Sequence, residues 1–519
     1  MNRRAMLQSI EQHDGPWDFI VIGGGATGLG VGVDAASRGY RTVLLEQHDF
    51  SKGTSSRSTK LVHGGVRYLR QGNISLVLEA LHERGLLMQN APHLVSHQAF
   101  VVPNYVWWDG PFYGAGMKVY DLLAGRLGLG PSRRLSKGET LQHIPTLESR
   151  ELRGGVIYFD GQFDDARLAI HLAQTMVEHG GAPINYIQVT GFIKSGEMID
   201  GVIARDMESG KEYQINGRVV VNATGVFTDA LLQLENPRAP RIISPSQGVH
   251  LILDKDFLPG ENAVMVPQTA DGRVLFAVPW HDKVVVGTTD TPVSEISLEP
   301  RALDEEIKFI LDHAALYLTK DPTRQDVKSV FAGLRPLVRA GEGKSTAAIS
   351  RDHYLVVSES GLVTITGGKW TTYRKMAEET VNHALLVAGL DDRGCLTKNL
   401  RIHGWLKNFD REDPLHYHGT DSVYIKKIVK ADPELGRKLH ESLPYIKAEV
   451  VWAVREEMAR TVEDVLARRT RALFLDARAS IEMAPEVARL MAQELSYDDA
   501  WCASQVNAYG NLAKGYLLV

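Results

Sequence analysis

The stretch 18–46, DFIVIGGGATGLGVGVDAASRGYRTVLLE, restricts the fold of this chain more than any other. Residues 19–22 form a short apolar run, Gly23-x-Gly25-x-x-Gly28 follows at once, and residues 42–45 predict a second strand. The glycine fingerprint alone is a weak signal, but here it lies between a strand and a helix in a βαβ unit of about thirty residues, the context that makes it specific. The chain therefore contains the dinucleotide-binding unit of a doubly wound α/β fold.

Three glycines and one acid have separate roles in such a unit. Gly23 makes the tight turn, Gly25 lets backbone N–H groups approach a pyrophosphate, and Gly28 lets the helix lie close to the sheet. The positive end of the helix dipole then faces the phosphates. Glu46 closes the second strand, where its carboxylate accepts hydrogen bonds from an adenosine ribose and repels a 2′-phosphate, which argues against NADP.

Composition limits the class of protein. At 519 residues the chain exceeds what one core usually serves, so we expect two or three domains. A hydrophobic content of 44%, a charged content of 23% and a net charge of −5 are those of a soluble globular protein and indicate no nucleic-acid partner. Two cysteines, Cys395 and Cys502, are too few for a disulfide framework, an iron–sulfur cluster or a thiolate zinc site, and we expect no metal.

No segment predicts insertion into a membrane. Residues 1–16 are polar and lack the apolar core of a secretory signal, and no window reaches eighteen apolar residues. We expect a protein of the reducing, cytoplasmic side, with peripheral attachment to the membrane left open.

A polar loop and a pair of glycines follow the first unit. The loop 51–59, SKGTSSRST, offers hydroxyls that can bind phosphate and ribityl groups, although a flexible solvent loop has the same composition. The next residues, 60–69, KLVHGGVRYL, place two adjacent glycines beside a histidine, an arginine and a tyrosine. Such a segment suits close approach of the backbone to a flat ligand.

Four motifs together point to one family. They are the dinucleotide unit, T-S-S-x-S-x-K-L-x-H-G-G-x-R-Y-L at 54–69, V-N-A-T-G at 221–225 and G-G-K-x-T-T-Y-R at 367–374. In this combination the chain resembles the FAD-dependent glycerol-3-phosphate dehydrogenases, which belong to the wider D-amino-acid-oxidase-like flavoproteins. The resemblance covers about 18–390 in order, and the helical remainder is compatible with the C-terminal cap of that family.

The resemblance implies FAD as the cofactor. It places a backbone contact to adenine at Val189 and puts Lys369, at a helix start, beside the pyrimidine edge of the flavin, where positive charge favours reduction. His63 could contact the flavin or even hold it covalently, as in some relatives of the wider superfamily, and we expect non-covalent binding. The implied cofactor residues are Gly23, Gly25, Gly28, Glu46, Thr54, Ser55, Ser56, Lys60, Leu61, His63, Gly64, Gly65, Val189, Gly225, Gly368, Lys369 and Thr372.

Cationic residues in the matched motifs indicate the substrate class. As single residues they would each be ordinary surface charges, but as a convergent set they suit a phosphate dianion better than an amino acid, which needs one arginine for its carboxylate. They are Arg67, Arg335, Arg351 and Lys369.

One histidine in the expected substrate domain suits acid–base chemistry. His250, in QGVH, is the candidate to accept the alcohol proton, with a structural histidine as the alternative. Tyr68 and Thr371 are expected to line the same site, and Arg335 and Lys369 to act in catalysis as well as binding.

The expected architecture is a Rossmann-like FAD domain of the two-dinucleotide type, an inserted antiparallel β substrate domain and a C-terminal helical cap. Short β runs at 249–253, 274–278, 284–286 and 347–350, interrupted by a helix at about 303–318, predict the substrate domain. The expected limits are FAD-binding segments 1–75, 156–235 and 351–390, a helical and aromatic connection 76–155, a substrate domain 236–350 and a cap 391–519.

The activity that the resemblance implies is oxidation of sn-glycerol 3-phosphate at C2 to dihydroxyacetone phosphate, by hydride transfer to flavin, and we hypothesise a quinone as the electron acceptor. The alternatives are an oxygen-dependent glycerol-phosphate oxidase, whose relatives carry an insertion that this length leaves little room for, and an amino-acid oxidase. A non-enzymatic binding protein with the same fold is disfavoured by the complete set of polar motifs.

A quinone acceptor requires contact with a membrane, and two stretches could provide it. The aromatic run 105–129 is either a buried connection or an interfacial surface. Residues 451–473 predict an amphipathic helix rich in arginine, either a solvated basic face or a surface for anionic lipid. We therefore expect attachment to the inner face of the cell membrane, and we leave a homodimer open.

Overall fold

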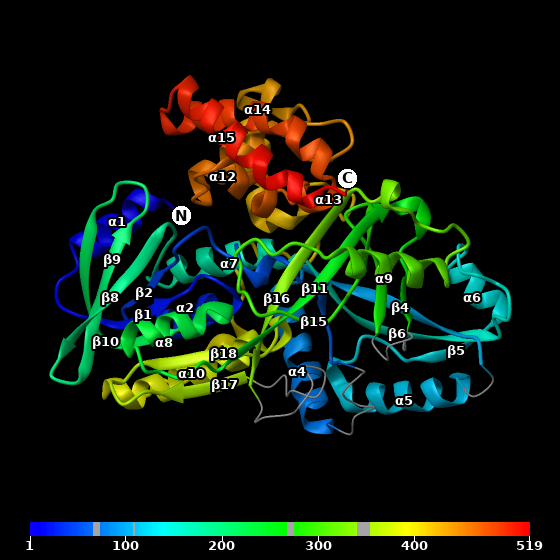
Figure 1. The fold of residues 1–519 in the computed structure, drawn as a ribbon, viewed down its shortest axis with the longest axis horizontal. Helices are drawn as coiled ribbons and strands as arrows, with labels where there is room; N and C mark the ends of the chain where they lie inside the picture. Colours follow the sequence, from blue (N-terminus) through cyan, green and yellow to red (C-terminus); the bar gives the residue numbers. More distant parts are fainter. Residues whose placement is uncertain (66–72, 107–108, 267–273, 340–352, 519) are drawn as a thin grey trace.

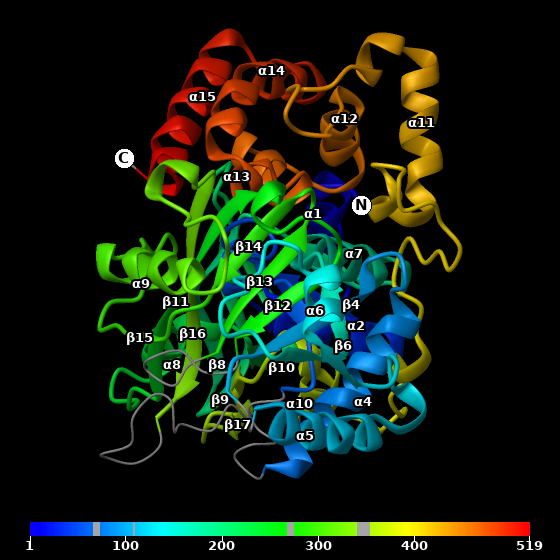
Figure 2. The same cartoon turned by 90° about the vertical axis from the view of Figure 1, so that its right-hand side faces the viewer.

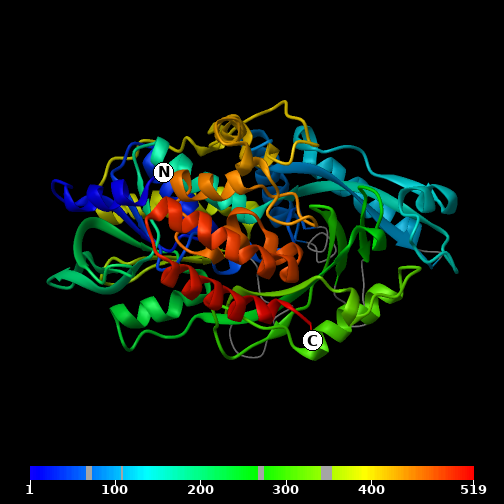
Figure 3. The ribbon, with the colours of Figure 1, turned by 90° about the horizontal axis from the view of Figure 1, so that it is seen from above.

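The computed structural model describes residues 1–65, 73–106, 109–266, 274–339 and 353–518, which form two large sheets and a helical unit that lies over them (Figure 1). Seen from above, the C-terminal helices cover the middle of the molecule (Figure 3). The α/β class with a helical C-terminal part is confirmed.

The first sheet contains the βαβ unit. Neighbouring strands run parallel, apart from an antiparallel strand at one edge. The order is β17 (His353–Val357), β18 (Val363–Gly367), β10 (Glu212–Asn222), β1 (Trp17–Ile22), β2 (Thr42–Leu45) and β7 (Ala182–Ile184).

Helices cover both faces of this sheet, which is why its strands are continuous apolar runs. α2 (Ala26–Ser37) packs between α7 (Asp165–Glu178) and α10 (Tyr373–Ala388) on one face. The other face packs against α1 (Arg3–Glu11) and the hairpin of β8 (Ile187–Ser195) and β9 (Met198–Asp206), which extends from β10.

The second sheet is almost wholly antiparallel, with one parallel pair, β4–β12. Its order is β15 (Thr291–Pro292), β11 (Ile243–Asp254), β14 (Lys283–Gly287), β13 (Leu275–Trp280), β12 (Ala263–Val266), β4 (Val95–Asn104), β6 (Gly154–Phe163) and β3 (Leu61–Val62). Two more strands join it, β16 (Ser329–Val338) on β11 and β5 (Arg133–Ser136) on β6.

Four helices cover this second sheet. α4 (Ile74–Asn90) and α5 (Asp109–Ala124) pack on one face, and α6 (Lys137–His143) and α9 (Asp304–Ala315) pack on the other (Figure 2). The expected helix at 303–318 and the strands at 249–253, 274–278 and 284–286 are therefore confirmed. The expected run at 347–350 lies outside the described residues.

The expectation of a helical connection over 76–155 is wrong for β4 and β5. Residues 95–104, VSHQAFVVPN, lie between β12 and β6 in the middle of the sheet, and Phe100, Val101 and Val102 are buried on successive positions. Because both faces of β4 are covered, its sequence does not alternate. β6, expected in the FAD-binding segment, also belongs to this sheet.

The C-terminal unit consists of helices that pack on each other and on the second sheet. The expectation of one amphipathic helix over 451–473 is wrong, because the segment is broken into α12 (Lys447–Glu456), a π-helical turn at Asp464–Arg469 and α13 (Ala472–Leu475). The outer helices are α11 (Ser422–Ala431), α14 (Ala477–Leu495) and α15 (Asp499–Ala513).

Three of the five arginines of this segment are neither a solvated basic face nor a lipid surface. Arg468, Arg469 and Arg471 are buried, and their partners are buried carboxylates of Asp49, Asp165 and neighbouring acids. They fasten the C-terminal unit to the first sheet.

Candidate active site

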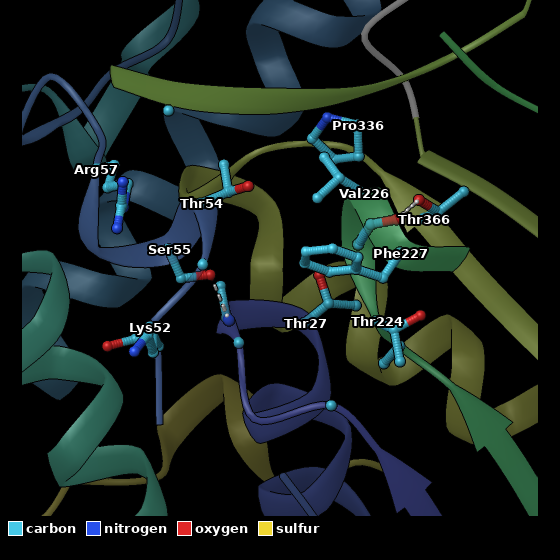
Figure 4. A pocket seen from close by; sticks show the side chains of 18 of the residues that line it. Thr27, Lys52, Thr54, Ser55, Arg57, Thr224, Val226, Phe227, Pro336 and Thr366 are labelled. Atoms are coloured by element: carbon cyan, nitrogen blue, oxygen red, sulfur yellow. Dashed lines mark hydrogen bonds between the residues drawn. The ribbon is translucent and has the colours of Figure 1, made fainter. Parts of the chain in front are cut away.

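A cavity of about 810 Å³ lies where the carboxyl ends of the first sheet meet the second sheet. Its walls come from the turn after β1, the end of β2, the loop 51–59, the start of β8, the segment after β10, strands β11 and β16, and the turn after β18. Figure 4 shows the loop residues Lys52, Thr54, Ser55 and Arg57 on one side and Phe227 on the other. Ligands of open α/β sheets bind at this edge.

The glycine fingerprint shapes one end of the cavity. Gly23 has φ +108°, and a Cβ there would lie 2.6 Å from the carbonyl oxygen of Ala223. Gly25 is the N-cap of α2, and a Cβ there would lie 3.0 Å from Oγ of Ser55. The Ala26 amide donates to that same Oγ at 2.9 Å, so the loop closes over the helix start.

Glu46 lines the cavity at the end of β2. Its carboxylate accepts hydrogen bonds from the backbone amides of Gly24, at 2.6 Å, and His48, at 2.8 Å. Burial raises the pKa of Glu46 above its usual value, against the lowering by these two hydrogen bonds. The two amides orient the acid toward the place where a ribose would lie.

The loop 51–59 is held from three sides. Thr54 Oγ1 donates to the Leu334 carbonyl at 2.6 Å, and Trp370 Nε1 donates to the Ser55 carbonyl at 2.8 Å. Arg57 forms an ion pair of 2.7 Å with Glu299. The loop is therefore a fixed wall, and the alternative of a flexible solvent loop does not hold.

The turn after β18 forms the facing wall. Gly367 and Gly368 have φ values of +77° and +67°, the tight turn expected there, and Lys369 follows as the cap of a short helix that precedes α10. Thr371 Oγ1 accepts a hydrogen bond of 3.2 Å from the His63 amide. Lys369, Thr371 and His63 all line the cavity.

His250 and Arg335 lie on paired strands of the second sheet. Arg335 is opposite Ser246 in the register of β11 and β16, and His250 is opposite Phe331, so both point from the same region toward the cavity. The Arg335 guanidinium donates to the carbonyls of Thr289, at 2.9 Å, and Gln247, at 3.2 Å.

The His250 ring is buried and firmly oriented. Its Nε2 lies 2.9 Å from Oγ1 of Thr59, and its ring stacks on Phe331 at 4.9 Å with an angle of 16° between the planes. Burial lowers the pKa of His250 well below its usual value, and the charges of Lys60 and Arg335 lower it further. The imidazole is therefore neutral at pH 7 and able to accept a proton.

Most of the residues expected in the site line this one cavity, although they come from eight separate segments. They are Gly23, Gly25, Glu46, Thr54, Ser55, Leu61, His63, Val189, Gly225, His250, Arg335, Gly368, Lys369 and Thr371. Arg67, Tyr68 and Arg351 lie outside the described residues.

Six expected cofactor residues are not in the lining: Gly28, Ser56, Lys60, Gly64, Gly65 and Thr372. Gly28 packs on the turn, where a Cβ would meet the Gly23 carbonyl at 1.9 Å, as expected for close helix packing. Gly64 lies against Leu81 and Tyr120 in the same way. Gly28 and Gly64 therefore allow close packing of the segments behind the cavity wall rather than lining the cavity themselves.

Lys60, expected among the cofactor residues, does not turn its side chain to the cavity. Its ammonium points away from the cavity and donates to the Ser56 carbonyl and to Asp165, each at 2.7 Å. A buried ammonium needs such partners because desolvation of an unpaired charge is costly.

Other lining residues were not among the expected site residues, and some of them lie within the motif at 54–69. Arg57 and Thr59 occupy variable positions of the motif at 54–69, so the motif carried no signal for either. The contact of Thr59 with His250, 191 positions away in the sequence, is seen only in the folded structure.

The shape and chemistry of the cavity fit FAD. A cradle that a Cβ would fill at Gly23 and Gly25 faces the N-terminus of α2, as a pyrophosphate requires. Hydroxyls of Thr54 and Ser55 and the acid of Glu46 surround it. The volume of about 810 Å³ lies in the range of cofactor-sized pockets.

Comparison with known proteins defines the class first. Residues 18–374 match the model of the FAD dependent oxidoreductases, and residues 363–502 match that of the C-terminal domain of alpha-glycerophosphate oxidase. Fold, cavity and family model together define an FAD-dependent oxidoreductase.

Individual relatives narrow this class. The chain is 42% identical to the probable mitochondrial glycerol-3-phosphate dehydrogenase of Caenorhabditis elegans and 39% identical to the mitochondrial enzyme of Homo sapiens, in each case over 96% of this chain and 73% of the relative. A structure of glycerol-3-phosphate dehydrogenase from Bacillus halodurans complexed with FAD is 30% identical, with a TM-score of 0.81 over 99% of this chain and 97% of that chain. This chain belongs to the family of FAD-dependent glycerol-3-phosphate dehydrogenases.

Proposed function

We propose that this chain oxidises sn-glycerol 3-phosphate to dihydroxyacetone phosphate with FAD and passes the electrons to a quinone at a membrane surface. The observation that carries the proposal is that a buried neutral imidazole and a guanidinium, His250 and Arg335, face the cavity that the dinucleotide unit also lines. A secondary alcohol with a phosphate group needs both a proton acceptor and an anion clamp.

The residues of the second sheet have complementary roles. Arg335 is held by the carbonyls of Gln247 and Thr289, by the Thr288 hydroxyl and, at 3.5 Å, by the Asp290 carboxylate, so its guanidinium can bind phosphate with little further loss of side-chain freedom. Lys369 adds a second positive charge from the facing wall. Arg67 and Arg351 complete the phosphate site in this proposal, on the strength of their motifs.

His250 accepts the proton of the C2 hydroxyl as the carbonyl of the product forms. Its contacts with Thr59 and Phe331 fix the plane of the ring, which places the accepting nitrogen before the substrate binds. Bound FAD supplies the acceptor for the hydride that leaves C2. Thr371 lines the site beside Lys369.

Attachment to the membrane is the second part of the proposal. Among the described residues, no helix combines the length and apolar character needed to cross a bilayer. α4, α5, α10 and β17 lie together at the lower end of the molecule in Figures 1 and 2, opposite the C-terminal unit. Exposed apolar side chains on these elements are Ile74, Leu78, Val119, Leu122, Tyr354, Val357 and Leu386.

The aromatic run 105–129 was expected to be either a buried connection or an interfacial surface, and α5 has one buried and one exposed apolar face. Met117 and Tyr120 are buried against the second sheet, whereas Val119 and Leu122 are 44% and 80% exposed. An apolar helix face with the nearby Lys118 suits a lipid interface. We propose this lower end as the surface on the inner face of the cell membrane.

One anaerobic experiment tests the activity. Purified yellow protein is mixed with sn-glycerol 3-phosphate, and bleaching of the flavin absorbance is followed, with glycerol and D-amino acids as controls. We expect bleaching with glycerol 3-phosphate alone. Bleaching by D-amino acids instead would contradict the substrate.

The acceptor and the oligomeric state need their own measurements. Reoxidation of the bleached flavin should be much faster with a soluble quinone than with oxygen, and equal rates would indicate an oxidase. Light scattering distinguishes the proposed alternatives of monomer and homodimer.

A further inference from the structure

Lys60 lies in a closed box below the active site. Its side chain is fully buried, and its ammonium donates to the Ser56 carbonyl and to Asp165, each at 2.7 Å. Three aromatic rings surround the ammonium at 5.2–5.3 Å from their centroids, those of Trp280, Phe331 and Phe474. Aromatic faces attract a desolvated cation, so the box stabilises the charged form.

The box joins five separate parts of the fold. Ser56 belongs to the cavity loop, Asp165 to α7, Trp280 to β13, Phe331 to β16 and Phe474 to α13 of the C-terminal unit. Arg471 reinforces the junction, because it donates to the Ser56 carbonyl at 2.8 Å and to Asp165 at 3.1 Å. None of these contacts reaches into the cavity itself.

Two neighbours of Lys60 are the groups that hold His250. Phe331, which forms one wall of the box, is the ring on which the imidazole stacks. Thr59, which precedes Lys60 in the chain, contacts Nε2 of the imidazole at 2.9 Å. A shift of Lys60 would therefore move both supports of His250 together.

We propose that Lys60 is a positioning residue for His250: its buried ammonium fixes Thr59 and Phe331 around the imidazole and places a positive charge near the ring. The proposal rests on the proposed role of His250 as proton acceptor. In this proposal the C-terminal unit helps to position His250, because its Phe474 and Arg471 contact Lys60 and the residues that hold Lys60.

The charges around the imidazole support the second half of the proposal. From the described elements packed against His250, the loop contributes Lys60, β16 contributes Arg335, and β14 contributes the backbone of Gly287. Both charged groups oppose a second positive charge. Burial lowers the pKa of Lys60 to about 7 against the opposing effect of Asp165, so Lys60 carries its proton in the acidic range where an imidazole would gain one.

The pH dependence of flavin bleaching by glycerol 3-phosphate tests the proposal. Lys60→Met removes the charge and the hydrogen bonds, and Lys60→Gln removes the charge but keeps an amide donor. Both should move the acidic limb of the rate upward by about one pH unit, so that the rate on the acidic side of the limb falls about tenfold, whereas the loss near pH 9, from the weaker hold on Thr59 and Phe331, should be much smaller. Lys60→Arg should restore the profile of the unmodified protein.

Control variants separate this role from a structural one. Lys283→Met removes an ammonium from the same sheet, where it pairs with Asp254 at 2.7 Å, and should leave the limb in place. Phe474→Leu removes one of the three rings around the ammonium but keeps the Lys60 charge and both of its hydrogen bonds, so it should lower the melting temperature and move the limb much less than the neutral variants do. FAD content, read from the absorbance ratio, should be retained in all variants.

Each other result overturns the proposal. Equal slowing at every pH in both neutral variants would leave Lys60 with a structural role only, and loss of FAD from both would place it in the cofactor site. A limb that persists in His250→Asn would show that another group titrates. Failure of the unmodified protein to bleach with glycerol 3-phosphate would instead refute the proposed function.

Discussion

The guanidinium of Arg469 donates two hydrogen bonds, of 2.6 and 2.9 Å, to the carboxylate of Asp49, 420 positions earlier in the chain. Both side chains are buried, and Asp49 lies four residues beyond Leu45, the last residue of β2. Burial by itself would raise the pKa of Asp49, but Arg469 and Arg468 hold it below its usual range. The C-terminal unit is thus fastened behind the adenosine side of the cavity.

Breaking this pair should destabilise the fold. Arg469→Met leaves the Asp49 carboxylate short of hydrogen-bond donors in a buried place, and we expect a loss of about 3 kcal/mol in the free energy of unfolding. Denaturant titration at pH 7 measures it. The exposed Arg478 in the same region provides a control, since Arg478→Met should change stability by no more than about 0.5 kcal/mol.

The cofactor prediction concerns Gly25. A valine there would put a Cβ 3.0 Å from Ser55 Oγ and would fill the approach of the pyrophosphate, so Gly25→Val should purify without yellow colour. The flavin absorbance at purification measures it. Gly138→Ala, in a helix with no atom within 4 Å of the added Cβ, should keep full colour. A yellow Gly25→Val protein would refute the assignment of the pyrophosphate site.

The substrate prediction concerns Arg335. Its replacement by alanine leaves a phosphate without its guanidinium, and we expect kcat/KM for glycerol 3-phosphate to fall by about 30- to 1000-fold, or about 2–4 kcal/mol. Arg335→Lys keeps a positive charge but lacks the planar guanidinium, so its kcat/KM should lie between those of the unmodified protein and Arg335→Ala. Glycerol should remain a very poor substrate of all three proteins, and an unchanged kcat/KM in Arg335→Ala would exclude a phosphate clamp at this position.

The pH prediction concerns His403, which joins α7 to the C-terminal unit. Its ring lies 2.6 Å from Glu178 and 2.8 Å from Asp421. Burial would lower the pKa of His403, but Asp421 and Glu178 raise it to about 9. A raised histidine pKa stabilises the fold fully below the unfolded value of about 6.5, and this contribution is lost as the pH rises through 9.

His403→Gln should therefore unfold more easily than the unmodified protein at pH 6, by about 2–3 kcal/mol, and the difference should shrink above pH 9. Melting temperatures across this range measure it. His440, whose partner Glu482 is 68% exposed, provides the control, because His440→Gln should show a much smaller effect at every pH. A pH-independent effect of His403→Gln would point to lost packing rather than lost charge.

The parts of the molecule that the sequence predicted are local ones. Gly23, Gly25 and Glu46 lie in one βαβ unit, where spacing alone determines which side chains meet. The adjacent glycines Gly367 and Gly368 indicate a tight turn, because two consecutive residues adopt positive φ values at little cost only when they lack a Cβ. The motifs then brought distant segments together by resemblance, and Arg335 and His250 do line the same cavity as the glycines.

The predictions that were wrong concern features that depend on tertiary contacts. β4 is covered on both faces, so its sequence has no alternation to detect. Arg468 and Arg469 were interpreted as surface charges because arginine side chains are mostly exposed in proteins. Their partner Asp49 is distant in the sequence and comes close to them only in the folded chain. Lys60 belonged to a cofactor motif by sequence, yet its side chain turns to the far side of the loop.

The last prediction concerns the membrane surface and Leu122. This side chain is 80% exposed on α5, at the lower end where Ile74, Leu78 and Val119 are also exposed (Figure 1). Interfacial binding scales with buried apolar area plus attraction to anionic lipid, so Leu122→Glu should reduce binding to vesicles that contain anionic lipid by about tenfold or more. Flotation at low and high salt measures the bound fraction. Val423→Glu alters another exposed apolar residue, 54% exposed, on α11 of the C-terminal unit, and should bind as the unmodified protein does. If the two variants lose binding equally, or if the unmodified protein stays free of vesicles at low salt, the lower end of the molecule is not the surface that meets the membrane.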